Sequence, residues 1–285
     1  MRVTKMEPRC GAEITGVDVT QMSESEWQAI YQTWLDSNVI VLRDQKLTID
    51  QFLEYSRRFG RLKPHRVRKT RHPDYPELTL MGINAKTADG KANAPIYNRG
   101  ANWHTDSPWD TDICKATQLY ALEIPSYGGD TLFANMYAAY EALPLGLKQR
   151  IEGLKAEFAY GGRTRQGIEL LEPEDQARPP AVHPIVRTHA ETGRKSLYVN
   201  RVHILRILGM SEAESNALIE ELFGHMLQPG AEYRHKWRVG DVVIWDNRCS
   251  IHSATGGYPL DENRIHWRVT IMESPEEVKA GQEAA

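Results

Sequence analysis

The stretch Thr117-Gln-Leu-Tyr-Ala-Leu-Glu-Ile-Pro-Ser-Tyr-Gly-Gly-Asp-Thr-Leu-Phe-Ala134 predicts two short strands, residues 117–123 and 131–134, joined by a turn rich in proline and glycine. Eight other segments are equally short, rich in Val, Ile, Thr and aromatic residues, and bounded by Gly, Pro or Asp: residues 39–43, 78–81, 154–160, 184–188, 196–200, 233–238, 241–245 and 265–272. No helix alternates regularly with these strands, which argues against a parallel βαβ sheet. The pattern favours a mainly β fold with a double-stranded β-helix (jelly-roll) core and peripheral α-helices.

The predicted helices are few, and three of them begin with a clear capping signal. Ser23–Glu26, Thr48–Gln51 and Ser211–Glu214 each place a hydroxyl residue three positions before Glu or Gln, and apolar residues at helical spacing follow. A short helix is expected around residues 136–143, ending before a proline. The polar segment Gly161–Pro180 is interpreted as a long loop of the kind that often covers an active site.

The composition is that of an ordinary globular protein of 285 residues, 41% of them hydrophobic and 26% charged. We expect residues 1–273 to form a single jelly-roll domain and residues 274–285 to form a flexible C-terminal tail. The net charge of −3 gives no sign of a nucleic-acid partner, and no apolar run approaches the roughly 20 residues that span a membrane. Three widely separated cysteines without a CxxC pair suggest a reduced, cytoplasmic protein.

Two His-x-Asp triplets occur in the chain, His72-Pro-Asp74 and His104-Thr-Asp106, and the triplet alone does not distinguish between them. The first is expected to be a surface turn, because one proline lies within it and another soon after it. The second lies in a segment that we expect to be extended, where positions i and i+2 point to the same face. His104 and Asp106 can therefore chelate one cation from one side.

A redox metal at this pair would need a third protein ligand from a distant strand, together with open coordination positions. Two histidines and one carboxylate on one face of an octahedron leave three positions free, which is the ligand set of non-haem iron(II) oxygenases. His252 is the candidate third ligand, because it follows the predicted strand 241–245 and a turn-like Asp246-Asn-Arg248. Taken alone, it is more typical of an ordinary loop histidine.

The segment Arg264-Ile-His-Trp-Arg268 places both arginines on one face of the last predicted strand. If this face points into the barrel, the two cations require anionic partners, and each could hold a carboxylate or a sulfonate by paired hydrogen bonds. If the strand lies at an edge, both side chains are simply solvated. The spacing leaves these alternatives open.

In their order along the chain, these motifs resemble the taurine dioxygenase and phenoxyacetate-herbicide dioxygenase family of Fe(II)- and 2-oxoglutarate-dependent oxygenases. The similar segments are spread over most of the chain and also include Gly11–Asp18, Val41–Gln45, Arg58–Gly60, Gly128–Leu132, His183–Arg187, Leu197–Asn200 and Trp245–Arg248. The long interval between the first ligand pair and His252 is also typical of the family. The resemblance implies a jelly-roll enzyme whose iron is held by His104, Asp106 and His252.

The resemblance also implies roles for four other residues. Thr131 and Arg264 would bind the far carboxylate of the co-substrate 2-oxoglutarate, with O2 as the oxidant. Arg268 and His65 match family positions that contact the prime substrate. The implied activity is hydroxylation of a C–H bond in a small acidic molecule (a sulfonate, sulfate ester, aryloxy acid or carboxylate), giving succinate and CO2, with C–S or C–O cleavage in some cases. A homodimer or homotetramer is also typical of the family.

The chain departs from the taurine enzymes at Gly100, where they have an asparagine four positions before the metal histidine. Trp103 and Trp109 favour a larger or aromatic substrate, although tryptophans in a wall are as often plain packing. Two rival readings stay open: a catalytically inactive jelly-roll protein that binds a metal or a small acid, and a metallohydrolase. The pairing of Thr131 with Arg264 argues against a site that holds only a metal.

Overall fold

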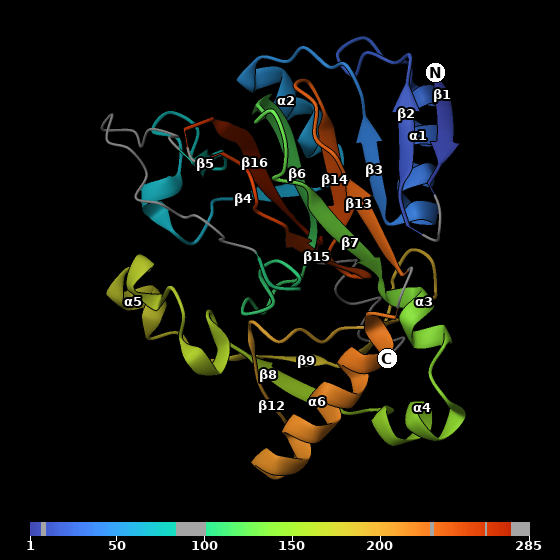
Figure 1. The fold of residues 1–285 in the computed structure, drawn as a ribbon, viewed down its shortest axis with the longest axis vertical. Helices are drawn as coiled ribbons and strands as arrows, with labels where there is room; N and C mark the ends of the chain where they lie inside the picture. The colour runs from blue at the N-terminus through green and yellow to red at the C-terminus, as the bar shows by residue number, and fades with distance from the viewer. Residues whose placement is uncertain (7–9, 84–100, 229–230, 260, 275–285) are drawn as a thin grey trace.

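The computed structural model describes residues 1–6, 10–83, 101–228, 231–259 and 261–274. An eight-stranded sheet occupies the upper half of Figure 1. Its strands lie in the order β1 (Arg2–Lys5), β2 (Ala12–Thr15), β3 (Val39–Leu42), β14 (Val242–Asp246), β6 (Cys114–Glu123), β16 (Arg264–Met272) and β4 (Arg61–Lys63), and β5 (Thr79–Ile83) also pairs with β16. The pairing of β2 with β3 is parallel and the others are antiparallel.

A smaller antiparallel sheet packs against this large sheet and completes the jelly roll. Its strands lie in the order β13 (Glu232–His235), β7 (Thr131–Asn135) and β15 (Ser250–Ala254). Buried side chains from both sheets form one apolar cluster, in which Phe133 and Trp237 meet Val243 and Trp245. The expected jelly-roll core is therefore confirmed, with the interior of the barrel lying between these two sheets.

Alternation along the central strands explains how the large sheet buries both of its faces. On β3, Val39 and Val41 belong to the cluster inside the barrel, whereas Ile40 and Leu42 pack toward the helices outside. This two-residue period follows from strand geometry, in which successive side chains point to opposite faces. A strand buried on both sides reads as a continuous apolar run, as these four residues do.

The outer layers are made mostly of helices and of two small sheets. The helices are α1 (Glu24–Ser37), α2 (Ile49–Arg57), α3 (Met136–Glu141), α4 (Leu145–Ile151), α5 (Pro173–Gln176) and α6 (Glu212–Met226). The small sheets are β12 (Ile204–Ile207) with β8 (Lys155–Phe158) and β9 (Ala181–Pro184), and β10 (Val186–Thr188) with β11 (Lys195–Leu197). These small sheets share a core with α3, α4 and α6, below the barrel in Figure 1.

The three predicted capping boxes all form. Ser23, Thr48 and Ser211 each accept a hydrogen bond from the backbone N–H three residues on, and the side-chain oxygen of the Glu or Gln at that position accepts one from the backbone N–H of the cap residue. These paired bonds satisfy backbone donors that have no partner inside the helix, which is why the signal locates a helix start so well.

The structure corrects the sequence interpretation in three places. Residues 161–180 are not a structureless loop, because they contain two 3-10 turns, Gly162–Thr164 and Ile168–Leu170, and the short helix α5. The predicted strand 184–188 is divided between β9 and β10. His252 lies on a strand, as a third ligand from a distant strand requires, but this strand, β15, was not among the predicted ones. Of the predicted tail, residues 275–285 lie outside the described residues, as does Gly100.

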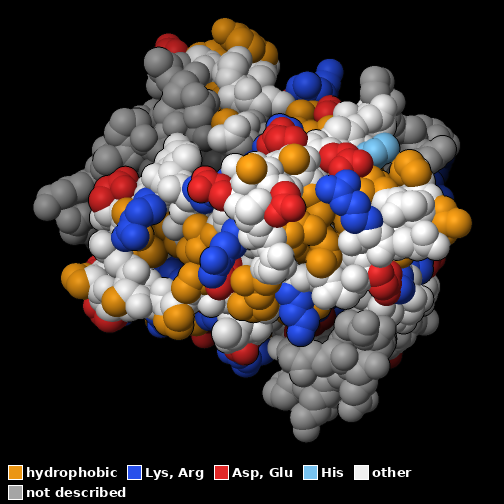
Figure 2. Space-filling view, turned by 90° about the horizontal axis from the view of Figure 1, so that it is seen from below, with side chains coloured by type: hydrophobic (Ala, Val, Ile, Leu, Met, Phe, Trp, Pro, Cys, Tyr) orange, Lys and Arg blue, Asp and Glu red, His pale blue; other side chains and the backbone are white. Residues whose placement is uncertain are grey.

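Across the face seen from below in Figure 2, positive and negative side chains are interspersed with hydrophobic ones. None of the helices in the described ranges combines the length and the hydrophobicity that crossing a bilayer requires.

Candidate metal centre

His104 and His252 are brought together by backbone pairing. The N–H of His104 donates to the carbonyl of His252 at 3.0 Å, and the N–H of His252 donates to the carbonyl of His104 at 2.8 Å. His252 itself is held by β15, which pairs with β7 and sets His252 opposite Phe133. Because mutual hydrogen bonds of this kind fix two residues directly opposite each other, the two imidazoles project from neighbouring backbones.

The three predicted ligands meet at one point, which we call the metal centre. One ligand atom from each of His104, Asp106 and His252 lies within 4.8 Å of the others. The Nε2 atom of His104 is 3.9 Å from one carboxylate oxygen of Asp106, and the Nε2 atom of His252 is 3.7 Å from the other. The donor set, two imidazole nitrogens and one carboxylate, is the facial set that suits iron(II).

Neighbouring polar groups orient these ligands. The Nδ1 atom of His104 lies 2.6 Å from the carbonyl of Asn102, to which it donates, so Nε2 is the nitrogen whose lone pair could bind a cation. The Thr117 hydroxyl donates to Asp106 Oδ2 at 2.7 Å. Asn247 links these elements, because its side-chain amide donates to the Thr117 hydroxyl at 3.0 Å while its Oδ1 accepts from the backbone N–H of Asp106 at 3.1 Å.

Arg268 also contacts the metal centre directly. Its Nη2 atom lies 2.7 Å from Asp106 Oδ1. Burial alone would raise the pKa of the Asp106 carboxyl, but Arg268 and the two histidines outweigh burial and hold that pKa well below its usual value. Burial, reinforced by the neighbouring His104, lowers the pKa of His252 to about 3. The carboxylate is therefore ionised and His252 is neutral, which are the forms that bind a metal.

Thr131 and Arg264 both lie next to the indole of Trp237. The indole Nε1 donates to the Thr131 hydroxyl at 3.0 Å, and the Arg264 guanidinium lies 6.0 Å from the ring centroid. Arg264 Nε donates to the carbonyl of Gly129 at 3.0 Å. A Cβ at Gly129 would lie 2.9 Å from that same nitrogen, so this close approach requires glycine.

His266 lies between the two arginines on β16 and shares their face. It is fully buried, and neither ring nitrogen has a hydrogen-bond partner among the described residues. Its ring packs against Trp237 at a centroid distance of 4.5 Å. Arg264 likewise forms no ion pair within the described part of the chain. Buried polar groups without partners are costly, so this face of β16 offers polar groups that a ligand could satisfy.

His65, the fourth residue predicted by resemblance, is buried and lines a cavity of about 280 Å³. Its Nδ1 accepts from the backbone N–H of Val67 at 3.2 Å. The other His-x-Asp triplet lies elsewhere in an exposed bend, where His72 Nδ1 accepts from the N–H of Asp74 at 3.2 Å. The interpretation of that triplet as a surface turn is confirmed.

Sequence reasoning missed two residues near the metal centre, Asn247 and His203. The His203 ring lies 6.1 Å from that of His104 and 4.4 Å from that of Trp109. Asn247 could have been noticed within Trp245–Arg248, a segment similar to the family, whereas nothing in the local pattern distinguishes His203. Trp109 is buried against Tyr160 and His203, whereas Trp103 packs against the core of the small sheets.

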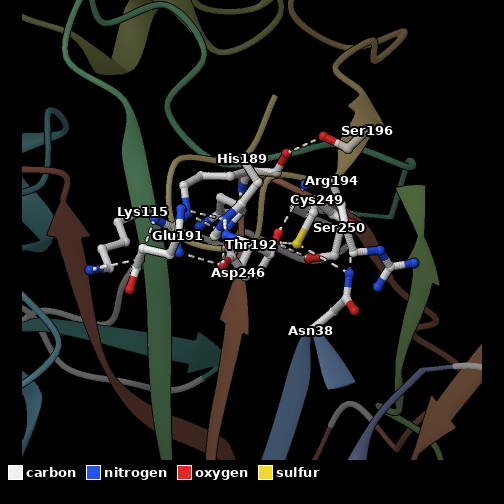
Figure 3. A network of polar contacts seen from close by, with 12 residues as sticks. Asn38, Lys115, His189, Glu191, Thr192, Arg194, Ser196, Asp246, Cys249 and Ser250 are labelled. Carbon is white, nitrogen blue, oxygen red and sulfur yellow. Dashed lines mark hydrogen bonds and ion pairs between the residues drawn. The ribbon is translucent and has the colours of Figure 1, made fainter. Parts of the chain in front are cut away.

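A second group of possible ligands, His189, Asp246 and Cys249, also gathers its donor atoms within 4.8 Å (Figure 3). Here Arg248 forms a bidentate ion pair with the Asp246 carboxylate, donating from Nε to Oδ1 at 2.9 Å and from Nη2 to Oδ2 at 2.6 Å. His189 Nε2 donates to Asp246 at 3.0 Å. We call this group the arginine-locked cluster.

The comparisons with known proteins agree with this geometry. The family model described as Taurine catabolism dioxygenase TauD, TfdA family matches residues 2–270. The chain is 35% identical over 278 residues to the alpha-ketoglutarate-dependent 2,4-dichlorophenoxyacetate dioxygenase of Cupriavidus pinatubonensis, covering 94% of this chain and 96% of that relative. It is 33% identical over 291 residues to an alkylsulfatase of Acinetobacter baylyi, covering 95% and 84%.

A solved structure of the same kind also matches. The crystal structure of AAD-2 in complex with Mn(II) and N-oxalylglycine has a TM-score of 0.81 at 28% identity, covering 96% of this chain and 98% of that one. Fold and sequence together define the class, the jelly-roll dioxygenases that depend on α-ketoglutarate (2-oxoglutarate). Within that class, the chain belongs to the TauD, TfdA family.

Proposed function

We propose that the chain is an Fe(II)- and 2-oxoglutarate-dependent dioxygenase that hydroxylates a C–H bond of a small acidic organic substrate. The observation that carries this proposal is the metal centre, where Nε2 of His104 and Nε2 of His252 both face the Asp106 carboxylate. With these three as ligands, half of an octahedral shell stays open for 2-oxoglutarate and O2. Bound iron(II) would supply the redox chemistry that activates O2.

Thr131 and Arg264 are proposed to bind the far carboxylate of 2-oxoglutarate. Arg264 is a partly buried cation without an ion-pair partner among the described residues, so it fits an incoming carboxylate. The unpartnered ring of His266 beside it supports the same placement. In the overall reaction one atom of O2 enters the substrate as hydroxyl, the other enters succinate, and 2-oxoglutarate loses CO2.

Arg268 is proposed to orient the prime substrate by its acidic group. One nitrogen of Arg268 contacts Asp106, while its Nε has no hydrogen-bond partner among the described residues. If the acidic group of the substrate bound at the Nε side of Arg268, the carbon next to that group would lie beside the metal. His65 is proposed as a further substrate contact.

The names of the relatives indicate which substrates to test first. One relative is named a 2,4-dichlorophenoxyacetate dioxygenase and another an alkylsulfatase, so aryloxy acids and sulfate esters are the first candidates, ahead of sulfonates and carboxylates. Hydroxylation next to oxygen or sulfur would lead to C–O or C–S cleavage.

We further propose that residues 1–273 form one domain and that the protein is a cytoplasmic homodimer or homotetramer. All three cysteines are free and buried, which suits a reducing compartment. Light scattering during size-exclusion chromatography measures the assembly, and a monomeric mass would reject both oligomers.

The test is a screen for substrate-stimulated succinate release by purified protein with iron(II), 2-oxoglutarate and O2. Aryloxy acids, alkyl sulfates, sulfonates and carboxylates are offered in parallel, with and without O2. Hydroxylated or cleaved product that requires both O2 and 2-oxoglutarate supports the proposal. Product formed without O2 would instead identify a metallohydrolase. Ligand binding with no succinate under any condition, including slow turnover without substrate, would identify an inactive binding protein.

A further inference from the structure

The cavity of about 280 Å³ is lined by residues that neighbour Asp106 in the chain and, through Thr117, in the sheet. Ser107, the next residue after Asp106, lines it. Thr270 lines it too, and Thr270 pairs in register with Thr117, whose hydroxyl donates to Asp106. His65, proposed above as a substrate contact, completes this wall. A substrate that reaches the metal past Asp106 would therefore extend into this cavity.

Aromatic contacts join another side of the cavity to the metal centre. The guanidinium of Arg66, which lines the cavity, lies 5.9 Å from the Trp109 ring. Trp109 in turn packs on His203, which lies beside His104. A chain of ring contacts thus connects Arg66, in the cavity wall, to His104 in the metal centre.

The lining of the cavity is strongly basic. Five lining side chains are cations and two are carboxylates: Lys63, Arg66, Arg68, Arg71 and Arg178 against Asp110 and Asp175. One more carboxylate, Glu174, pairs with Arg68 from outside the lining. Even when Glu174 is counted, positive charges exceed negative ones by two. A concave surface with such an excess attracts anions and raises their local concentration.

The two carboxylates are already shared between cations. Asp110 lies 3.0 Å from Lys63 Nζ and also pairs with Arg66. Asp175 lies 2.9 Å from Arg178 and 3.5 Å from Arg68. The segment 161–180, through α5, thus supplies charges that face the residues after β4.

Arg71 is the cation in the cavity lining that has no ion pair with Asp110 or Asp175. Its Nε donates to the carbonyl of His65 at 2.6 Å, and no carboxylate of the described residues forms an ion pair with it. Burial and the neighbouring Arg68 lower the pKa of Arg71, and burial lowers the pKa of Arg66 despite its contact with Asp110. Burial thus makes the positive charge of both guanidiniums costly in the absence of an anionic partner.

We propose that this cavity binds the far end of the prime substrate and that this end carries a second anionic group, bound by Arg71. The substrate class is then a small dianion with one acid on Arg268 and the other on Arg71. The proposal rests on the proposed function, since it extends the substrate away from the metal. A guanidinium fork suits a planar carboxylate or a sulfonate, and the cavity volume is near the lower end for small-molecule sites.

The experiment compares two aryloxy acids that differ by one charge, phenoxyacetate and 4-carboxyphenoxyacetate. Calorimetric titration under anaerobic conditions, on full-length protein loaded with Mn(II) and 2-oxoglutarate, gives a Kd for each. For the wild type we expect the dianion to bind about tenfold more tightly or better, as expected for one added charge-assisted contact. In Arg71→Gln we expect the ratio of the two Kd values to fall to about one, because the second acid loses its partner.

Two controls keep the comparison specific. Arg206→Gln removes an exposed arginine that pairs with Glu157 away from the cavity, and it should keep the wild-type ratio. If Arg71→Gln fails to fold, as judged by its melting curve, Arg178→Gln takes its place and should lower the ratio by a smaller factor.

A third arm uses inorganic sulfate, which distinguishes a free anion from the acid of a substrate. Sulfate that weakens binding of the dianion more than binding of phenoxyacetate supports the proposal. A wild-type ratio near one, or a ratio that Arg71→Gln leaves intact, overturns it. Sulfate binding that depends on Arg71 without any preference for the dianion also overturns it, because the cavity then holds a free anion. These binding ratios can be measured even if no succinate is ever released, so failure of the proposed function is seen separately.

Discussion

The metal centre and the arginine-locked cluster offer similar atoms to a cation, yet their surroundings differ. In the metal centre the Nε2 atoms of both histidines point at a carboxylate that one nitrogen of Arg268 contacts. In the arginine-locked cluster Nδ1 of His189 accepts two backbone N–H groups at 3.2 Å, and its Nε2 donates to Asp246. Every ligand atom of that imidazole is therefore already in use.

The acid and the thiol of the arginine-locked cluster are equally occupied. Burial alone would raise the pKa of Asp246, but Arg248 and His189 outweigh it and keep that pKa below its usual value. Burial, with the nearby Asp246, raises the pKa of the Cys249 thiol well above its usual value, which disfavours the thiolate that binds metals. Donor atoms that lie close together are therefore not enough to make a cation site. A cation site also needs lone pairs that no other group has taken.

The largest expected effect is at Asp106. Asp106→Ala removes the one anionic ligand and should abolish both stoichiometric iron binding and succinate release, a loss of about 100-fold or more. Metal content after dialysis and succinate yield measure it. The matched control is Asp74→Ala, in the other His-x-Asp triplet, which should keep both properties. Equal losses in the two variants would mean that the metal centre is misassigned.

The next effect concerns Arg248, which neutralises Asp246 inside the protein. Arg248→Met leaves that buried carboxylate without its cationic partner, with only the neutral His189 still donating to it, and should lower the free energy of unfolding by about 3–5 kcal/mol. Urea unfolding measures the loss, and Arg206→Met, at an exposed ion pair, should cost at most about 1 kcal/mol. At low temperature the folded fraction should still bind iron. A folded variant without iron binding would show that the two clusters are not separate.

A smaller effect is expected at Thr117, which orients the Asp106 carboxylate. Thr117→Val removes that hydrogen bond and should weaken metal affinity by about 10-fold, while stability changes by about 1 kcal/mol. Competition with a chelator gives the affinity. Thr70→Val deletes another buried hydroxyl, one that donates to the Val67 carbonyl, and should leave metal affinity unchanged. Unchanged affinity in Thr117→Val would remove Thr117 from the support of the metal centre.

The smallest effect is a pH dependence at Glu191, which pairs with Arg248 and Lys115. Burial would raise its pKa, but these two cations lower it from 4.5 to about 2. A carboxyl whose pKa is depressed on folding stabilises the protein above its unfolded pKa, and that contribution is lost as the pH falls toward the folded pKa. Glu191→Gln should therefore flatten the fall in unfolding free energy between pH 4.5 and pH 2, by about 1 kcal/mol at pH 3, because the exposure of Glu191 to solvent screens roughly half of the effect that linkage alone would give. Glu212→Gln, on an exposed helix end, should retain the wild-type slope, and an equal slope in all three proteins would contradict the assignment.

The sequence predicted those features that local chemistry determines. The capping boxes placed α1, α2 and α6, and the apolar runs placed β3, β6 and β14. β15 was not recognised, because Ser250-Ile-His-Ser-Ala254 is short and largely polar and becomes a strand through its pairing with β7. The turns within 161–180 depend on glycines at positive φ, such as Gly161 and Gly167, which a count of polar residues does not reveal.

The surroundings of the metal centre were harder to foresee for the same reason. His104, Asp106 and His252 could be grouped because family order supplied their companions. The contact of Arg268 with Asp106 and the bridging role of Asn247 arise from strand register, which no single segment encodes. The basic cavity likewise joins residues 63–71 to residues 175–178, two segments that are far apart in the chain.

The mutual backbone hydrogen bonds between His104 and His252 have a consequence for metal selection. The backbone pairing fixes the two imidazoles before any ion binds. The protein therefore cannot select between ions through a conformational change that only one of them induces. Affinities of a fixed nitrogen and oxygen site rise from manganese through iron to copper. The identity of the ion in the cell would then be decided by which metal is available when the protein folds, and copper or zinc supplied in excess should displace iron.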